Sequence, residues 1–181
     1  MPWNDLDEAA VPRRGLMSPS ESEGPDTADT PPARAPSRRH VTRIAVVQTL
    51  YQADLTGKKI PVAAREMRKH YLGRAVDGET PVAADPKFFD TVIEAVNANG
   101  PTLIEMLQSA LKNRPLERME LVLQAILLAG AAELFAVQEA PPKVIISEYV
   151  EIAEHFFGRP EASVVNATLD KIGHLVRPDE F

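Results

Sequence analysis

The chain contains no cysteine, and this absence removes a whole class of chemistry from consideration. Without thiols it has no disulfide framework, no thiolate nucleophile and no cysteine-ligated metal, a composition typical of proteins in a reducing cytoplasm. It also lacks any apolar run of the roughly 18–20 residues that a membrane span needs. The N-terminus does not show the basic-then-apolar pattern of a secretory signal. We therefore expect a cytoplasmic protein that has no contact with membranes.

Positive charge is also in short supply. Lys and Arg number 20 against 26 Asp and Glu, which gives a net charge of −6. The field of such a molecule repels phosphate, so any binding of nucleic acid needs a local basic patch and the help of a partner.

Sequence motifs for catalysis, cofactors and metals are missing as well. Gly57-Lys58 lacks the upstream glycine of a phosphate-binding loop. The segment from Glu151 to His155 lacks the second histidine that a zinc-binding helix requires, and we interpret it, with Glu148, as a solvated face. No serine lies in a nucleophile elbow. We therefore predict a protein that is not an enzyme and needs no cofactor, metal or small-molecule substrate.

The first 36 residues differ in composition from the rest. They hold seven of the 16 prolines and four of the six net negative charges. Such a segment cannot bury enough apolar surface to offset the entropy lost on ordering. We predict a disordered, acidic, Pro-rich tail at 1–36, which contains the sole tryptophan Trp3, and a folded domain at 37–181.

From Ser37 onward, apolar residues recur with the period of helices, and no segment alternates as a strand does. Ser37 and Asp85 are predicted N-caps, Asn99-Gly100-Pro101 is a predicted stop, and Gly158 is a predicted left-handed C-cap. Residues 121–135 are apolar nearly all round, which indicates a buried central helix. We therefore predict an all-α fold, a compact helical bundle around that central helix. About seven helices are expected, near 38–53, 62–72, 86–98, 103–114, 116–138, 143–157 and 162–175, with a loop at 73–84.

The start of the first helix, residues 38–52, concentrates positive charge beside an aromatic side chain. Arg39 and Arg43 continue one apolar stripe, and His40 and Tyr51 share the stripe beside it. Because arginine is costly to bury unpaired, we expect these arginines to project beyond the core. A basic arm can track phosphates, and Tyr51 can stack on a base for roughly 1–3 kcal/mol. From the residues alone, a merely solubilising helix start with a half-buried Tyr51 is an equal alternative.

Two polar residues interrupt otherwise apolar helices, Glu133 and Asn166. Burying either without a partner costs on the order of 1–3 kcal/mol. We favour an intramolecular hydrogen bond for each. A surface for another protein is the alternative.

Four blocks of the chain, at residues 43–52, 125–134, 142–153 and 165–172, contain distinctive motifs, among them Arg43-Ile-Ala-Val-Val-Gln48-Thr-Leu-Tyr51 and Val165-Asn166-Ala-Thr-Leu169-Asp170. In their order and spacing these blocks resemble the NusB family of bacterial transcription antitermination factors. The resemblance extends over about 37–177 and implies an all-α domain that pairs with ribosomal protein NusE. The pair would bind boxA-type single-stranded RNA in ribosomal RNA operon leaders and act in the RNA polymerase antitermination complex to promote read-through.

The resemblance also assigns site residues at matching positions. The chain departs from the family pattern in both the central and the later blocks. Three residues are expected to contact a partner: Leu123, Glu133 and Val164. The departures include Leu128, Ala132, Ser147 and Val164. The predicted RNA-binding residues are Arg38, Arg39, His40, Arg43, Gln48 and Tyr51.

Two alternative functions remain open at this point. One is a protein-only interaction module or homodimer that does not bind boxA. The other is the helical RNA-binding part of a ribosomal RNA methyltransferase, which shares this domain, although the sequence contains no glycine-rich cofactor loop.

Overall fold

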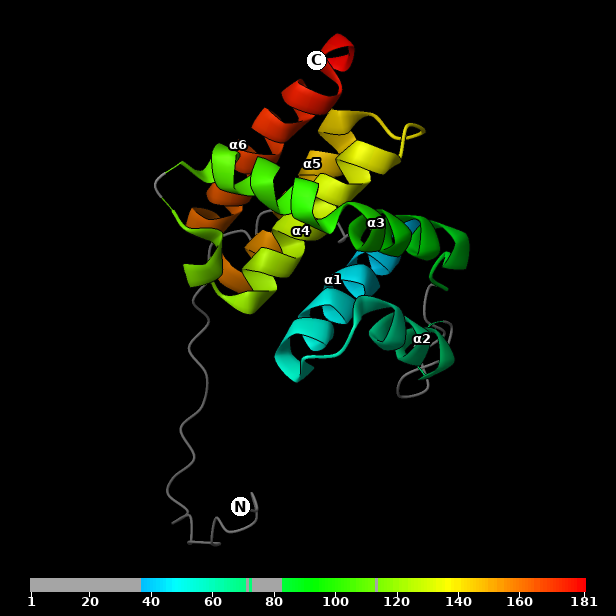
Figure 1. The fold of residues 1–181 in the computed structure, drawn as a ribbon. Helices are drawn as coiled ribbons and strands as arrows, with labels where there is room; N and C mark the ends of the chain where they lie inside the picture. The colour runs from blue at the N-terminus through cyan, green and yellow to red at the C-terminus, as the bar shows by residue number, and fades with distance from the viewer. Residues whose placement is uncertain (1–36, 71, 73–82, 113) are drawn as a thin grey trace, which may run out of the picture. The chain divides into compact units, whose positions relative to one another are not determined.

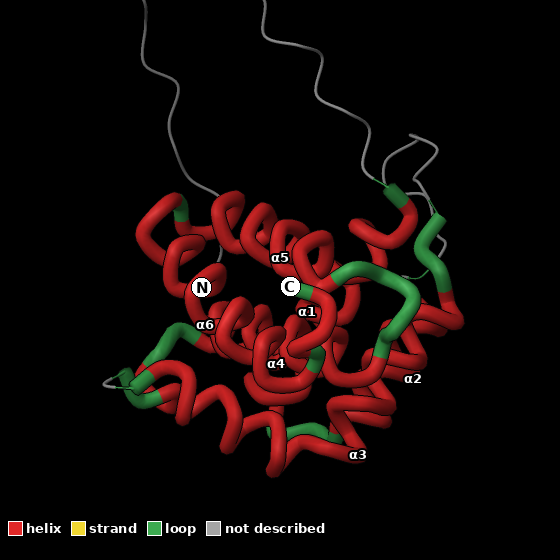
Figure 2. The backbone as a smooth tube through the Cα atoms, turned by 90° about the horizontal axis from the view of Figure 1, so that it is seen from above, coloured by secondary structure: helices red, strands yellow, loops and turns green. Residues whose placement is uncertain are grey.

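The computed structural model describes residues 37–181 apart from 71, 73–82 and 113. These residues form six α-helices and two short 3-10 helices, and no strand occurs among them (Figures 1 and 2). The predicted all-α class is therefore confirmed. The predicted tail with Trp3, and most of the predicted loop at 73–84, lie outside the described residues. The helices are α1 (Arg38–Thr56), α2 (Ile60–His70), α3 (Pro86–Leu111), η1 (Leu116–Arg118), α4 (Leu121–Ala136), α5 (Pro142–Phe157), α6 (Arg159–Val176) and η2 (Pro178–Glu180).

The starts of α1 and α3 use the predicted caps. The Ser37 hydroxyl accepts a hydrogen bond from the backbone N–H of His40 at 3.1 Å. The Asp85 carboxylate does the same for the first turn of α3, where Pro86 occupies a position that needs no N–H. At its other end, α1 stops at Gly57, whose left-handed φ of 65° lets its N–H cap the last turn.

The predicted stop at Asn99-Gly100-Pro101 is wrong, because α3 runs through it as one helix of 26 residues. This continuation explains why there are six α-helices where about seven were expected. Pro101 removes only one backbone donor, and the Asn99 side chain adds a bond to the carbonyl of Ala95 at 3.0 Å. Beyond the proline, Leu103 and Leu107 are fully buried. Their packing outweighs the local helix-breaking signal.

Helix α4 is the predicted central helix. It packs against α1, α3, α5 and α6, and Figure 1 shows it between the α1–α2 pair and the α5–α6 pair. Its glycine permits a close approach: a Cβ on Gly130 would lie 2.6 Å from Cδ1 of Leu169 on α6 and 3.2 Å from Cδ2 of Tyr149 on α5.

The link between α5 and α6 is a single residue, Gly158. Its φ of 88° is positive, but its ψ of −171° is extended. The predicted left-handed cap is therefore wrong in detail, and α6 begins at once with Pro160 in its first turn. At the far end of α6, Arg177 is buried and donates to the carbonyls of Val137 at 3.1 Å and Ala140 at 2.9 Å. The C-terminal segment thus holds the loop between α4 and α5.

Candidate nucleic-acid interface

Two arginines lie at the surface where α1 begins. Nε of Arg38 donates to the carbonyl of Ala83 at 3.0 Å, which orients the guanidinium without neutralising it. The guanidinium of Arg39 lies 5.3 Å from the ring centroid of Phe88, and its Nη2 is 3.7 Å from a carboxylate oxygen of the exposed Glu139. An exposed ion pair of this kind contributes little to stability. Both arginines therefore present positive charge to the solvent.

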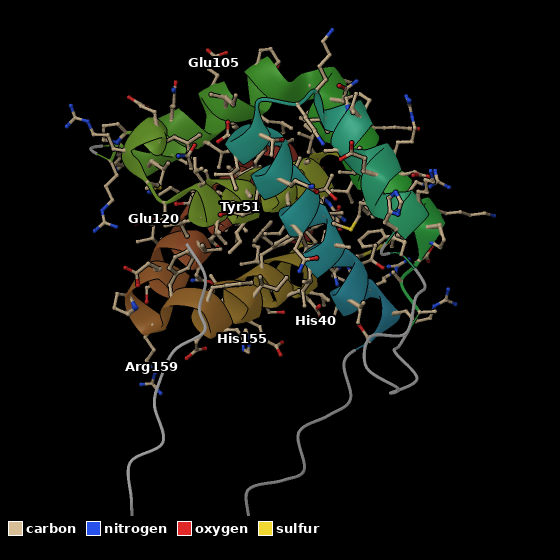
Figure 3. The ribbon with its side chains drawn as sticks, turned by 90° about the horizontal axis from the view of Figure 1, so that it is seen from below. His40, Tyr51, Glu105, Glu120, His155 and Arg159 are labelled. Atoms are coloured by element: carbon tan, nitrogen blue, oxygen red, sulfur yellow. The ribbon has the colours of Figure 1, made fainter. Side chains whose placement is uncertain are left out.

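The other predicted residues of α1 fall on one side of the helix. His40, Gln48 and Tyr51 are spaced at i, i+8 and i+11, which places them along one stripe. Gln48 is exposed, and Tyr51 is half-buried against the core. His40 lies in the first turn of α1, whereas Tyr51 lies five residues before the end of the helix (Figure 3). Nδ1 of His40 lies 3.1 Å from Oε2 of Glu148 on α5. The stripe offers an imidazole, an amide and an aromatic face.

Arg43 does not project beyond the core, so that expectation is wrong. Its side chain is 2% exposed and forms two hydrogen bonds to Glu133, with Nη2 to Oε1 at 2.6 Å and Nε to Oε2 at 2.9 Å. A third runs from Nη1 to Oε2 of Glu148 at 2.9 Å. The cost of burying an arginine applies to an unpaired one, and here the charge is fully paired. Arg43 is therefore a structural residue that joins α1 to α4 and α5.

The same carboxylate has a further partner from α5. Tyr149 is fully buried, and its hydroxyl donates to Oε2 of Glu133 at 2.9 Å. Burial, followed by the nearby charge of Glu133, raises the pKa of Tyr149 well above its usual value. Burial alone would lower the pKa of Arg43, but the bonds and charge of Glu133 outweigh it and raise that pKa. Tyr149 thus stays neutral and Arg43 stays charged. We call Arg43, Glu133, Glu148 and Tyr149 the buried charge cluster.

The cluster decides between the interpretations of Glu133. Its favoured intramolecular bond is confirmed, and because its side chain is 0% exposed it offers no surface to a partner. Glu148 was expected on a solvated face but turns into the cluster instead. Sequence reasoning missed Glu148 and Tyr149, although Arg43 and Glu133 each needed a partner, and matching the two would have indicated the cluster.

The remaining predicted residues have mixed positions. Leu123 is buried, so its side chain offers little surface for the partner contact expected of it. Val164 is half-buried and lines an open depression of about 250 Å³ between α3 and α6. Asn166 is exposed, so it has no burial cost to offset and its expected intramolecular bond is not needed. Of the departures from the family pattern, Ala132 is buried and Leu128 packs against the core.

Two other types of site are absent from the part of the chain that the structure describes. No cluster of three or more His, Asp or Glu side chains is arranged to hold a metal ion there. None of the helices in that part is long and apolar enough to cross a membrane.

Comparisons with known proteins show which family the chain resembles. The model of the NusB family matches residues 40–174. The transcription antitermination protein NusB of Bradyrhizobium diazoefficiens is 42% identical over 146 residues, which cover 80% of this chain and 88% of that protein. The protein of the same name from Agrobacterium fabrum is 38% identical over 148 residues, which cover 81% of this chain and 90% of that protein.

Two solved structures share the fold. T. maritima NusB matches with a TM-score of 0.64 at 21% identity, covering 81% of this chain and 98% of that chain. A chain from the structure described as "Crystal Structure of a Plectonemic RNA Supercoil" matches with a TM-score of 0.61 at 18% identity, covering 75% and 93%.

Proposed function

This chain belongs to the NusB family of transcription antitermination proteins, and from that premise we propose that it binds boxA-type RNA together with ribosomal protein NusE. In this proposal the pair assembles on the leader of ribosomal RNA transcripts and joins the RNA polymerase antitermination complex, which then reads through terminators. The protein acts as an adaptor, and it carries out no catalysis of its own.

One observation carries the proposal: the exposed basic start of α1 leads directly into the stripe of His40, Gln48 and Tyr51. Arg38 and Arg39 offer cations for phosphates, the Gln48 amide can pair with a base edge, and the ring of Tyr51 can stack on a base. The structural neighbour described with an RNA supercoil is consistent with RNA as the ligand. Arg43 is not part of this proposed contact set, because its donors are used inside the protein.

The net charge supports the need for a partner. A chain at −6 repels RNA except at its local patches, so a basic ribosomal protein beside α1 would correct the field. We therefore expect weak binding of boxA RNA by the chain alone and tight binding by the pair.

The proposal is tested by titrating labelled boxA RNA with the chain, with and without NusE, at several salt concentrations. The double variant Arg38→Gln/Arg39→Gln should weaken binding and reduce the log–log salt slope by about 1.4, since each contact to a single strand contributes about 0.7. The matched control is Arg118→Gln/Arg159→Gln, two exposed arginines away from α1. If both variants bind like the parent, the assigned site is refuted. If the parent forms no complex with RNA and NusE near physiological salt, a protein-only module is favoured instead.

A further inference from the structure

A second basic surface lies on α2, outside the stripe already described. Residues 58–70 contain five basic residues and one acid, Glu66, in a chain whose net charge is negative. Arg65, Arg68 and Lys69 are spaced at i, i+3 and i+4, so they share one helix face. That face is exposed, while Ala63, Ala64 and Met67 bury the opposite one. We call these three basic residues the α2 face.

Two of these cations are not engaged inside the protein. Lys58 pairs with Glu66 at 2.8 Å, and Arg68 pairs with both carboxylate oxygens of Asp90 at 2.8 and 2.9 Å. Arg65 and Lys69, by contrast, form no ion pair or side-chain hydrogen bond with any described residue. They border an open depression of about 640 Å³ between α2 and α3. Glu94 on α3 borders the same depression and would repel a polyanion, so a polyanion would approach from the side of α2.

The α2 face lies near the proposed RNA site, because the end of α2 and the start of α1 both contact the first turns of α3 or the residues just before it. Arg38 donates to the carbonyl of Ala83, just before α3, and Arg68 pairs with Asp90 in its second turn. Asp85 and Asp90 are separated by about 8 Å along the helix axis. The helices α1 and α2 pack against each other and run side by side in Figure 3. The start of α1 and the end of α2 thus flank one end of α3.

We propose that the α2 face binds the phosphate backbone of RNA flanking the segment held by α1, as a second, sequence-independent contact. This inference rests on the proposed function, since it extends the same RNA path. The alternative occupant is the acidic segment 1–36. Its four net charges are spread over 36 residues, whereas RNA carries one charge per nucleotide and releases condensed counterions when it is bound. The density of charge therefore favours RNA.

The experiment compares two RNAs, one limited to boxA and one extended at both ends by natural leader sequence, with the full chain and NusE. Arg65→Gln/Lys69→Gln should leave binding of the short RNA unchanged and weaken binding of the extended RNA. The salt slope for the extended RNA should fall by about 1.4 in the variant. The ratio of the variant's dissociation constant to the parent's should therefore shrink about seven-fold between 50 and 200 mM salt. Arg118→Gln/Arg159→Gln serves as the matched control, and an unchanged Tm confirms folding.

The outcomes separate the two proposals. Equal binding of the extended RNA by parent and α2 variant, with a loss for Arg38→Gln/Arg39→Gln, overturns the α2 inference alone. A higher affinity of the α2 variant for the extended RNA also overturns the α2 inference, and it indicates that the acidic segment 1–36 occupies the α2 face. If the α2 variant binds the short RNA more weakly than the parent does, the α2 face does not bind flanking RNA as proposed. No effect of Arg38→Gln/Arg39→Gln on either RNA refutes the proposed function itself.

Discussion

Removal of Arg43 is expected to destabilise the domain rather than to weaken RNA contact directly. In Arg43→Met, the buried Glu133 carboxylate loses its cation and is left in the core with only the Tyr149 hydroxyl as a partner. Removing one member of a buried pair costs about 3–5 kcal/mol. Glu148 adds little to this loss, since about a quarter of its side chain is exposed and it retains His40. For a domain of this size the loss corresponds to a fall in Tm of about 6–20 °C.

A second substitution separates the loss of Arg43 from the carboxylate that it leaves unpaired. Adding Glu133→Gln to Arg43→Met removes the stranded charge and leaves an amide oxygen for Tyr149. The double variant should therefore be more stable than Arg43→Met alone, although it carries one more substitution. Arg39→Met, at an exposed cation, should change the free energy of unfolding by less than about 1 kcal/mol.

Urea unfolding followed by circular dichroism gives these free energies, and RNA titration is performed on the fraction that remains folded. If Arg43→Met unfolds like the parent and yet loses RNA affinity, Arg43 is a surface ligand and the buried charge cluster has been misinterpreted. A double variant less stable than the single one would show that the stranded carboxylate is not the source of the loss.

Three further predictions concern packing, pH and the C-terminal segment. Gly130→Ala should cost about 1–3 kcal/mol, because its methyl group would overlap Leu169; a calorimetric Tm equal to that of the parent would show that α6 moves aside freely. The pKa of Tyr149 is raised in the folded protein. Its contribution to the free energy of unfolding is therefore complete below the pKa of the unfolded state, about 10, and is lost as the pH rises through the pKa of the folded state. The stability gap between parent and Tyr149→Phe should therefore narrow in urea titrations above about pH 10, and a constant gap would contradict this. Arg177→Met should cost about 2–4 kcal/mol because buried carbonyls between α4 and α5 lose their donor, while the exposed Arg159→Met should be nearly neutral in the same thermal assay.

Much of the fold could be predicted from the sequence, because helix caps and apolar periodicity are local signals. Ser37, Asp85 and the apolar run of α4 each contained enough information to place an element. The continuity of α3 was not predictable in this way, since Leu103 and Leu107 override Pro101 only once α4 and α6 are in place.

The candidate site was predicted less well, for a related reason. Arg43 looked like a surface cation, since its partner Glu133 lies 90 residues further along the chain. The spacing of the α2 face was visible in the sequence, but its position beside the start of α1 depends on how α3 packs. Charge alone therefore located a basic region without distinguishing its structural arginine from its exposed ones.

The wide sequence separation within the buried charge cluster has a kinetic consequence. Its bonds from α1 span 90 residues to α4 and 105 residues to α5. Closing such long loops precedes any gain from the contacts, so we expect these charges to stay hydrated until α1 has docked. Glu133→Gln should then speed unfolding while leaving the refolding rate nearly unchanged, which stopped-flow measurements can resolve. The cluster would govern how long the native state lasts, and helix packing would govern how fast it is reached.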